Sequence, residues 1–373
     1  MSQFDVVVCG LGVMGSATAY MLARRGQRVL GLDRFTPGHD RGSSHGETRI
    51  IRLSYFEHPS YVPLLRRAYE LWRELEQAAG RQFLHITGIA EIGPPDGALV
   101  TGTLASARLH GLAHEIVTAS ELTRRYPAFR PPPHDVAVLQ PDGGFVEAEP
   151  AIHALLALAR HHSATIRDGE TVRAIEPRAN GVRIVTDRDV IEARSAVVAA
   201  GPWLKLLLPE LPAPLRPTRQ AMAWFEPREP ALLAHLPVFL IESEHGVHYG
   251  FPPFGSRGVK VARHHHHDQT VEPDSYDTRV SPDDEAAIRA GIAEHLPAAN
   301  GALLGASTCL YTMAPDGDFI IDRLPGAPQI VVVSPCSGHG FKFAPVIGVI
   351  AADLAVDGLT RHDISRFTLA RFA

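Results

Sequence analysis

The pattern of apolar positions predicts a strand, a turn, a helix and a second strand at the start of the chain. The run FDVVVC at 4–9 is apolar and β-branched, and a glycine-rich turn follows it. Ala19, Leu22 and Ala23 then recur at helical spacing, and RVLGLD at 28–33 is a second apolar run that ends at an acid. Strand–helix–strand units of this kind build parallel sheets, so we expect an α/β fold.

Two later segments return to the same pattern. Residues 181–203, GVRIVTDRDVIEARSAVVAAGPW, predict two strands joined by a polar hairpin, and the second strand ends in the stretch AAGPW. Residues 327–358 predict a buried strand, a glycine turn and a helix whose apolar positions include Val346 and Ile350. We expect both segments to rejoin the first α/β unit.

The first turn has the glycine spacing of a dinucleotide-binding motif, Gly10-x-Gly12-x-x-Gly15. Gly10 makes the tight turn, Gly12 lets the backbone approach a pyrophosphate, and Gly15 lets helix and strand pack closely. The helix N-terminus offers N–H groups to the anion, and Asp33 at the end of the second strand can bond a ribose. Because strand, helix and acid are in register, the motif predicts dinucleotide binding rather than a purely structural turn.

Composition narrows the class of protein. The 373 residues, 45% of them hydrophobic, can bury a large core, and a net charge of −5 without long runs of one sign gives no footprint for nucleic acid. Three cysteines are too few for a disulfide framework and indicate a reducing compartment. Neither a signal peptide nor an apolar run long enough for a membrane span is seen. We therefore expect a cytoplasmic protein without nucleic-acid or membrane partners.

The segment 36–55, TPGHDRGSSHGETRIIRLSY, does not continue the regular units of a simple NAD domain. From Glu47 onward the chain can turn helical, which would place Thr48, Arg49 and Arg52 on neighbouring positions. Arginines there are either solvated surface charges or a clamp for an anion. The glycine motif alone leaves FAD and NAD open, but the later return to the nucleotide unit favours FAD, whose long body spans several chain segments.

Several ordered blocks resemble the monomeric sarcosine oxidase family of flavoprotein amine oxidases, within the D-amino-acid-oxidase-like superfamily. They extend nearly from end to end and are GLGVMGSATAYMLARRGQRVLGLDR (10–34), GSSHGETRIIR (42–52), PDGGF (141–145), YGFPPFG (249–255), TCLYTMAPDGDFIID (308–322) and SGHGFKF (337–343). The resemblance implies an FAD-binding Rossmann-like domain with a second, α+β substrate domain built on a mainly antiparallel sheet.

Lys342 stands between two phenylalanines, just after Gly338 and Gly340. The glycines let the backbone approach a flat ligand, and the helix that follows points its positive end at it. A lysine in such a setting is seldom buried without an anionic partner; the alternative is that it snorkels to solvent. The resemblance implies that Lys342 and Arg52 together hold the substrate carboxylate.

The resemblance also implies a covalent bond between FAD and Cys309. Cys336 is a chemical rival, because it lies beside the glycine turn and a thiolate is the nucleophile in either case. We expect Cys336 to serve in packing instead, and Cys9 to be a small core residue. Arg49 matches the family arginine near the flavin, where a fixed positive charge would stabilise electron-rich flavin.

Further residues match active-site positions of the family. His45, about two helical turns before the clamp arginine, is expected to hydrogen-bond substrate or flavin, unless it is a surface histidine. Tyr249 and His264 are expected near the substrate amine. Alternation in GVKVAR (258–263) separates Lys260 from its valine neighbours, and the resemblance implies that this lysine activates oxygen. The alternative is a strand lysine that faces solvent.

The resemblance places Tyr311 and Leu240 in the wall of the substrate cavity, with Leu240 where sarcosine-specific members have methionine. The run HHHH (264–267) invites a metal-binding interpretation. Neighbouring residues of a strand point to opposite sides, however, and no set with ligand spacing stands nearby. We therefore expect no metal site and exposed histidines at 265–267.

These motifs together define a discontinuous organisation. The FAD-binding domain is expected to comprise 1–86, 144–213 and 314–373, and the substrate domain 87–143 and 214–313. The expected cofactor-binding residues are Gly10, Gly12, Gly15, Asp33, Arg34, Ser43, Ser44, Thr48, Arg49, Val172, Gly201, Trp203, Cys309, Gly338, Gly340 and Lys342.

The expected activity is FAD-dependent oxidation of a secondary amine amino acid of the N-methyl or cyclic kind. A hydride would pass to flavin N5, O2 would be reduced to hydrogen peroxide, and the imine would hydrolyse. Two alternatives stay open: a dehydrogenase that passes electrons to a quinone or protein acceptor, and a flavin-binding protein without turnover. The family precedent favours a monomer, and the sequence does not choose among secondary amines.

Overall fold

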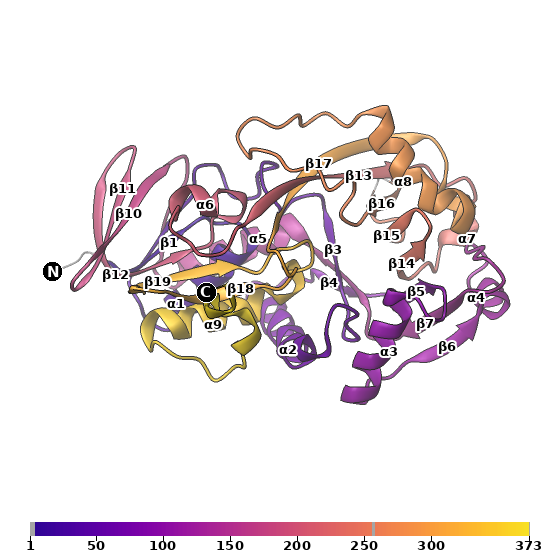
Figure 1. The fold of residues 1–373 in the computed structure, drawn as a ribbon, viewed down its shortest axis with the longest axis horizontal. Helices are drawn as coiled ribbons and strands as arrows, with labels where there is room; N and C mark the ends of the chain where they lie inside the picture. The colour runs from indigo at the N-terminus through magenta and orange to yellow at the C-terminus, as the bar shows by residue number, and fades with distance from the viewer. Residues whose placement is uncertain (1–3, 256–257, 373) are drawn as a thin grey trace.

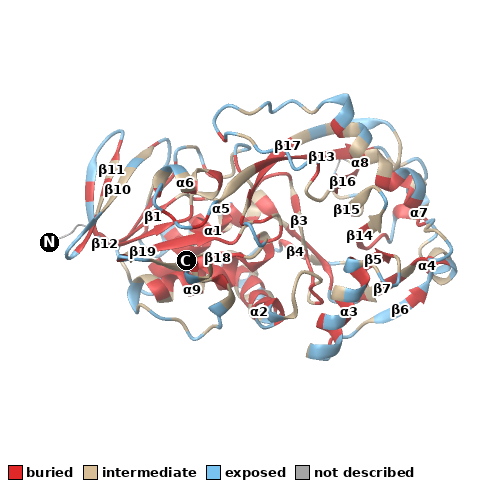
Figure 2. Cartoon of the chain, in the orientation of Figure 1, coloured by how far each residue is buried: buried red, intermediate tan, exposed pale blue. Residues whose placement is uncertain are grey.

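The computed structural model describes residues 4–255 and 258–372, so the first three residues and the last one of the expected FAD-binding domain lie outside the described part. Two sheets stand at opposite ends of the molecule, and the long strands β13 (Arg216–Phe225) and β17 (Leu303–Met313) reach from one toward the other (Figure 1). Buried residues concentrate in the strands and in the helices that cover them (Figure 2). No helix in the described ranges combines the length and apolar character needed to cross a bilayer.

The first sheet has eight strands within the described residues, in the order β10-β11-β12-β1-β2-β9, with β19 beside β12 and β18 beside β19. Strands β1, β2, β9, β12 and β19 are parallel, and the outer hairpins are antiparallel. The strands are β1 (Phe4–Cys9), β2 (Val29–Leu32), β9 (Thr165–Arg167), β10 (Val172–Arg178), β11 (Gly181–Thr186), β12 (Val190–Val198), β18 (Ile320–Leu324) and β19 (Ala327–Ser334). The expected α/β unit is confirmed.

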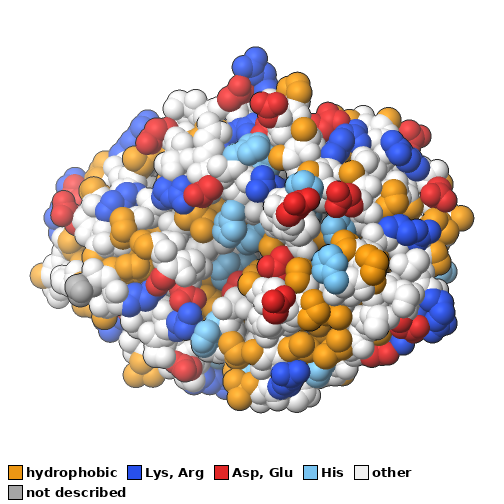
Figure 3. All heavy atoms as spheres, turned by 45° about the vertical axis from the view of Figure 1, so that its right-hand side comes forward, with side chains coloured by type: hydrophobic (Ala, Val, Ile, Leu, Met, Phe, Trp, Pro, Cys, Tyr) orange, Lys and Arg blue, Asp and Glu red, His pale blue; other side chains and the backbone are white. Residues whose placement is uncertain are grey.

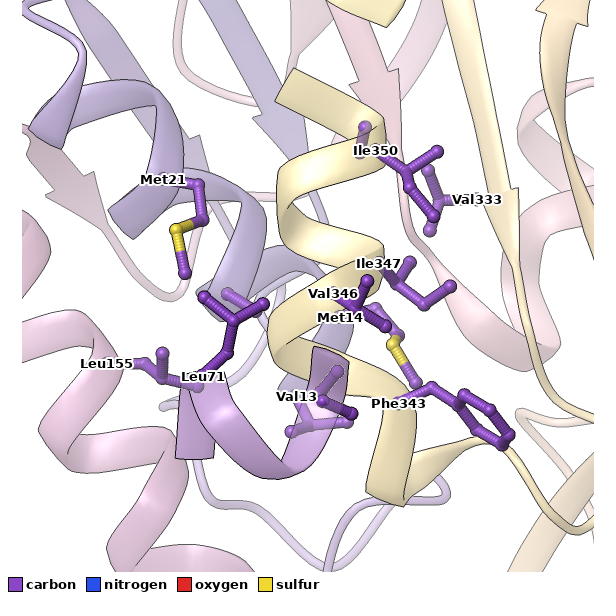
Figure 4. Close-up of a cluster of buried hydrophobic side chains, with 14 of the residues drawn as sticks. Val13, Met14, Met21, Leu71, Leu155, Val333, Phe343, Val346, Ile347 and Ile350 are labelled. Carbon is purple, nitrogen blue, oxygen red and sulfur yellow. The ribbon is translucent and has the colours of Figure 1, made fainter. Parts of the chain in front are cut away.

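Three helices form the layer next to this sheet: α1 (Val13–Arg24), α5 (Ala148–His161) and α9 (Ala344–Val356), with α2 (Val62–Ala79) packed against α9. Figure 4 shows Met14, Val346 and Ile347 among the side chains that fill the space between them. Gly348 lies so close to α1 that a Cβ atom there would come within 2.8 Å of the Ala17 backbone. This close crossing fixes the N-terminus of α1, and with it the glycine turn, over the sheet.

The second sheet has the order β17-β13-β16-β15-β14-β5-β7-β6 within the described residues and is antiparallel except between β14 and β5. The helices α3 (Ala98–His110), α4 (Ala119–Arg125) and α8 (Pro282–His295) pack beside it. The short helix α7 (Pro230–Leu233) lies between β13 and β14, whereas the short helix α6 (Leu204–Leu207) contacts β10 of the first sheet. The other strands of the second sheet are β5 (Ile89–Gly93), β6 (Glu115–Thr118), β7 (Val136–Gln140), β14 (Val238–Ser243), β15 (Gly246–Gly250) and β16 (Val259–Arg263). The mainly antiparallel second unit is therefore confirmed.

The expected helix after Glu47 is wrong. Residues Thr48–Ile51 form strand β3, which pairs with β8 (Gly144–Glu147) in a small sheet that also holds β4 (Leu84–Ile86). Gly46 and Glu47 both have positive φ, 95° and 69°, which a right-handed helix cannot accommodate. The β-branched stretch after them then pairs as a strand. His45 and Arg52 are consequently not two helical turns apart.

The expected strand over AAGPW is also wrong, because β12 ends at Val198 and Gly201–Trp203 is a turn of 3-10 helix. Gly201 has φ of 51°, which lies outside the strand region. The hairpin before it, β11 with β12, is as expected.

Candidate active site

The glycine turn and its acid form one wall of an elongated cavity. Gly10 has φ of 94°, and a Cβ atom on Gly15 would lie 1.8 Å from the Gly10 carbonyl oxygen, so both positions require glycine. The Asp33 carboxylate accepts the N–H of Leu11 at 2.6 Å and the N–H of Phe35 at 2.8 Å. Burial raises the pKa of Asp33, and these backbone bonds oppose that effect.

Most of the expected nucleotide-binding residues line this first cavity: Gly10, Gly12, Asp33, Arg34, Ser43, Ser44, Val172, Gly201 and Trp203. Gly15 lies beneath the turn and sets its shape. Asp274, from the second unit, also lines the cavity and accepts hydrogen bonds from Arg34 at 2.6 Å and from the Trp203 indole at 2.8 Å. Sequence reasoning missed Asp274, because nothing local marks a residue that crosses between the two units.

A second cavity continues from the first. Both are lined by Val13, Met14, Ser43, Ser44, Pro335 and Cys336. The second cavity adds residues from β3, β14, β15 and β17 and from the SGHGFKF turn. A ligand with a nucleotide at one end and a flat ring at the other would fill both, which is the shape of FAD.

Arg52 and Lys342 face the second cavity from two distant parts of the chain. They are 3% and 6% exposed, so the surface alternatives for both side chains are excluded. Arg52 is held by the Glu57 carboxylate, with N···O distances of 3.0 and 2.9 Å, and its guanidinium lies 4.4 Å from the Tyr55 ring centre. The two basic groups that the sequence predicts as a clamp are therefore brought together.

Glu57 is a cavity residue that sequence reasoning missed. It lines the second cavity. Burial alone would raise the pKa of Glu57, but the positive charge of Arg52 outweighs this effect and the pKa falls to about 2. The signal in the sequence is weak: an acid five residues after an arginine in a loop is common on surfaces. Only the fold shows that this pair is inside the protein.

Lys342 donates to the carbonyl oxygen of His339 at 2.7 Å, and its ammonium lies 5.1 Å from the Tyr55 ring centre. His339 in turn contacts the Tyr55 hydroxyl through Nδ1 at 2.6 Å. Burial, and then the charge of Arg52, lowers the pKa of Lys342 to about 7. The ammonium of Lys342, which stands between two phenylalanines in the sequence, therefore loses its proton near neutral pH.

Gly338 and Gly340 shape the turn that carries Lys342, and both line the cavity. Gly338 has φ of 85° and lies under the Tyr311 ring, where a Cβ atom would meet the ring at 2.4 Å. A Cβ atom on Gly340 would come within 1.5 Å of the Pro335 carbonyl oxygen. The two glycines therefore allow neighbouring segments of the protein to pack closely, and they also let a ligand in the cavity come close to the backbone.

Lys260 is 3% exposed and lies beside the turn at 46–48 rather than in the cavity wall. Its ammonium donates to two carbonyl oxygens, that of Gly46 and that of Thr48, the latter at 2.8 Å. The Thr48 hydroxyl oxygen lies 3.3 Å from the same ammonium. Burial, and then Arg49, lowers its pKa well below the ordinary lysine value. The solvent-facing alternative for Lys260 is excluded.

Arg49 and His45 belong to the same turn. The Arg49 guanidinium lines the cavity and donates to the carbonyl oxygens of Thr48, Ser43 and His45. His45 is buried, which excludes the surface alternative, although it does not line either cavity. Burial, and then Arg49, lowers the pKa of His45 to about 4, so this imidazole is neutral at physiological pH.

The remaining expected substrate residues meet on one wall of the second cavity. Tyr249, His264, Tyr311 and Leu240 all line it. Nδ1 of His264 is 3.5 Å from the Tyr311 hydroxyl, and burial lowers the pKa of His264 well below its ordinary value. Figure 3 shows histidine and acidic side chains gathered near the middle of the face it displays.

Cys309 lines the second cavity, and Cys336 lies at the junction of both cavities. Burial raises the pKa of each thiol, but Arg49 and then Lys260 oppose this effect at Cys309, whereas no cation does so at Cys336. Cys336 therefore has access to both cavities, and its expected role in packing stays a prediction. Cys9 is fully buried, as expected.

The histidine run does not form a strand. His264 begins a turn in which His265 and His266 have positive φ, His266 is buried, and His265 is half-buried, so the exposure expected at 265–267 holds for His267 only. His266 bonds the Asp284 carboxylate at 2.7 Å. Ligand atoms of His266, His267 and Asp284 lie close together, but Arg219 already binds both oxygens of Asp284, at 2.9 and 2.8 Å. The expectation that no set of possible ligands stands near the histidine run is therefore wrong, although the carboxylate of this set is already bound by Arg219.

Comparisons with known proteins agree with this geometry. The family model described as FAD dependent oxidoreductase matches residues 5–354. The chain belongs to this family. FAD dependent oxidoreductases are enzymes, and the two joined cavities, the glycine cradle and Asp33 fit the cofactor that the family name states.

Individual relatives are similar over their whole length. Monomeric sarcosine oxidase of Streptomyces avermitilis is 41% identical, with 99% of this chain and 98% of the relative covered. N-methyl-L-tryptophan oxidase of Salmonella typhi is 36% identical, with both chains fully covered. Among solved structures, NikD, an unusual amino acid oxidase essential for nikkomycin biosynthesis, has a TM-score of 0.88 and 30% identity, and the match covers 99% of this chain and 98% of NikD.

Proposed function

We propose that this FAD dependent oxidoreductase oxidises amino acids whose amine is secondary, such as N-methyl or cyclic amino acids. The observation that carries the proposal is the buried pair Arg52 and Lys342 in a cavity continuous with the dinucleotide cavity. Two buried cations beside each other favour an anion, and a carboxylate matches the planar guanidinium. The names of the relatives, sarcosine oxidase and N-methyl-L-tryptophan oxidase, support the same substrate class.

In this proposal the basic pair orients the substrate by its carboxylate. Arg52 would bind the substrate carboxylate while it stays paired with Glu57, and Lys342 would supply the second donor. Tyr249, His264 and Tyr311 would enclose the amine, while Leu240 and Ile50 would contact apolar substituents. Burial keeps His264 neutral, so its imidazole can accept a hydrogen bond from the substrate amine.

When bound, the flavin would accept a hydride at N5 and pass both electrons to O2, which leaves as hydrogen peroxide. Water then converts the substrate imine into an amine and a carbonyl compound. Lys260 and Arg49 would supply fixed positive charge beside the ring, and a fixed charge stabilises the charge that develops as oxygen is reduced. The 46–48 turn holds the Lys260 ammonium in place for this role.

We also propose that the flavin is attached through Cys309. The nearby cations Arg49 and Lys260 support it, because they favour the thiolate at Cys309. In Cys309→Ala the flavin should become extractable by acid precipitation, whereas Cys336→Ala should retain it in the pellet. The reverse result would assign the bond to Cys336, and extractable flavin in the unmodified protein would show that no bond forms.

The substrate class is tested by a panel of N-methyl, cyclic and primary amino acids. The purified yellow protein is mixed anaerobically with each compound, and loss of flavin absorbance is followed; peroxide is then assayed in air. Rapid bleaching by secondary amines with stoichiometric peroxide supports the proposal. Bleaching without peroxide would favour a dehydrogenase, and no bleaching by any member would contradict turnover on amino acids.

The chain is further proposed to be a cytoplasmic monomer with the domain limits 1–86, 144–213 and 314–373 against 87–143 and 214–313. The monomeric state is supported by the word monomeric in the name of the sarcosine oxidase relative. The proposed domain limits are supported by the two large sheets, because the strands of each sheet fall within the ranges proposed for one domain. Light scattering on the purified protein would measure its mass directly.

A further inference from the structure

A second buried carboxylate, Glu91, lies directly behind Arg52. Glu91 is in strand β5, is 0% exposed, and places Oε1 3.7 Å from the Arg52 Nε atom. Its other oxygen, Oε2, accepts a hydrogen bond from the side chain of Gln140 on β7. Oε1 has no hydrogen-bond partner within the part of the chain that the structure describes. Glu91 does not line the cavity, whereas Arg52 does, so Glu91 contacts Arg52 without being a contact for substrate in the cavity.

The carboxyl groups near Arg52 already balance the charges of the two basic groups. Two cations, Arg52 and Lys342, already share the cluster with two carboxyl groups, Glu57 and Glu91. A substrate carboxylate would make three carboxyl groups against two cations among buried side chains. Because an unpaired buried charge is costly, one carboxyl group must take a proton.

Glu91 is better suited than Glu57 to take that proton. Both oxygens of Glu57 bond Arg52, and its pKa of about 2 keeps it ionised. Burial raises the pKa of Glu91 to about 7, and Arg52 opposes this only in part. Among the other groups that face Glu91, Glu57 is anionic and disfavours a second negative charge. The remaining neighbours carry no charge; they are Thr103 on α3, Gln140 on β7 and Leu240 on β14.

We propose that Glu91 is a positioning residue for Arg52 that takes up one proton from solvent when a substrate carboxylate binds. This inference rests on the proposed function and deepens it, since it concerns the same carboxylate clamp. As a carboxylate, Glu91 anchors the free guanidinium from behind; as a neutral acid, it lets Arg52 direct its charge to substrate. No bond to substrate forms at Glu91, and only a proton moves.

The first test measures how tightly propionate binds to the flavin-loaded protein. Propionate has a carboxylate but no amine, and its binding is read from the flavin absorbance between about pH 6 and about pH 9. If Glu91 and Lys342 each take up a proton, the affinity of the unmodified protein falls by up to about a hundredfold per pH unit above their pKa values. Glu91→Gln imitates the neutral acid, so its affinity should fall by no more than about tenfold per unit and exceed the unmodified value at high pH.

A matched control is Asp135→Asn, which removes another buried carboxyl charge close to β7 but whose partners are His134 and His295. The pH dependence of this variant should be that of the unmodified protein. An unchanged pH profile in Glu91→Gln would overturn the proposal, as would the same flattening in Asp135→Asn.

The second test begins with the unmodified protein and uses Glu91→Gln only to assign the signal. Infrared difference spectra of the unmodified holoprotein, with and without carboxyl-labelled propionate, should show a new C=O stretch of a protonated carboxylic acid. This band should be missing in Glu91→Gln. A spectrum without the band, or a band that persists in Glu91→Gln, contradicts the assignment to Glu91. If propionate does not perturb the flavin at all, the carboxylate clamp fails together with this inference; bleaching by N-methyl amino acids without the band contradicts the inference alone.

Discussion

At the scale of single residues, two buried lysines do different work because their partners differ. Lys342 has one carbonyl acceptor and faces Arg52 across the cavity, so its charge is only weakly compensated. Lys260 has two carbonyl acceptors and a hydroxyl in the 46–48 turn, which fix its position. The first is therefore suited to respond to a ligand, and the second to hold a charge in a fixed place.

Lys342 should make carboxylate binding depend on pH. Its pKa of about 7 lies below the ordinary lysine value, so the ammonium is complete below that pH and is lost as pH rises through it. Lys342→Gln should weaken propionate binding at low pH by roughly tenfold to a hundredfold, the value of one charge-assisted hydrogen bond. Its decline above neutral pH should be shallower than in the unmodified protein, as measured by flavin absorbance titration. Lys342→Arg keeps its charge, so equal steepness in this variant and the unmodified protein would refute the assignment.

Lys260 should act on oxygen and not on substrate. In Lys260→Met, stopped-flow measurement should show that the reduced flavin reacts with O2 at least about a hundredfold more slowly, the usual effect of removing one preorganised charge. Anaerobic reduction by substrate should change little, because Lys260 does not line the cavity. Lys205→Met is a matched control, since this lysine lines neither cavity. Equal losses in both half-reactions would contradict the role.

At the scale of elements, the local sequence pattern was sufficient to predict units in which strand, turn and helix follow each other. It was insufficient where a partner strand far along the chain decides which element a segment forms. The strand–glycine–helix unit around Gly12 and Asp33 follows from periodicity and spacing. The segment after Glu47 became a strand because β8, nearly a hundred residues later, offers it a partner. Glu57 and Glu91 share this limit: an acid in a loop or strand shows its role only when Arg52 lies beside it.

The two glycines of the first turn should differ in what they support. A Cβ atom on Gly12 would meet only the Ser44 hydroxyl oxygen, at 3.3 Å, whereas one on Gly15 would lie 1.8 Å from the Gly10 carbonyl oxygen. Gly12→Ala should therefore fold with a near-normal melting temperature but retain less FAD, because the methyl group faces the cavity. Gly15→Ala should lose about 2–4 kcal/mol of unfolding free energy, the range of overpacking and strain. Flavin content and thermal unfolding measure the two effects, and equal stability losses in both variants would contradict the distinction.

At the scale of the whole molecule, a segment from the other unit forms part of the wall of the dinucleotide cavity. The chain after the histidine turn carries Asp274 to the cavity, where its carboxylate joins Arg34, beyond β2, to Trp203, beyond β12. Figure 1 shows the orange loop between β16 and α8 extending beside β17. FAD bound in the cavity would therefore lie beside residues of both units, and this connection would help to retain it.

Opening that connection should speed the exchange of cofactor. In the Cys309→Ala background, where FAD is expected to be held without a covalent bond, Asp274→Ala removes two hydrogen bonds of a half-exposed carboxylate. Because solvent weakens such bonds, the loss is about 1 kcal/mol, and FAD should dissociate roughly fivefold faster. The rate is measured by trapping released FAD with an excess of an apoflavoprotein. Asp277→Ala is the matched control, because Asp277 pairs with its neighbour Arg279 in the same segment and does not line the cavity. The same rate in both variants would show that the segment does not retain the cofactor, and that the walls formed by the glycine turn and the SGHGFKF turn hold FAD without it.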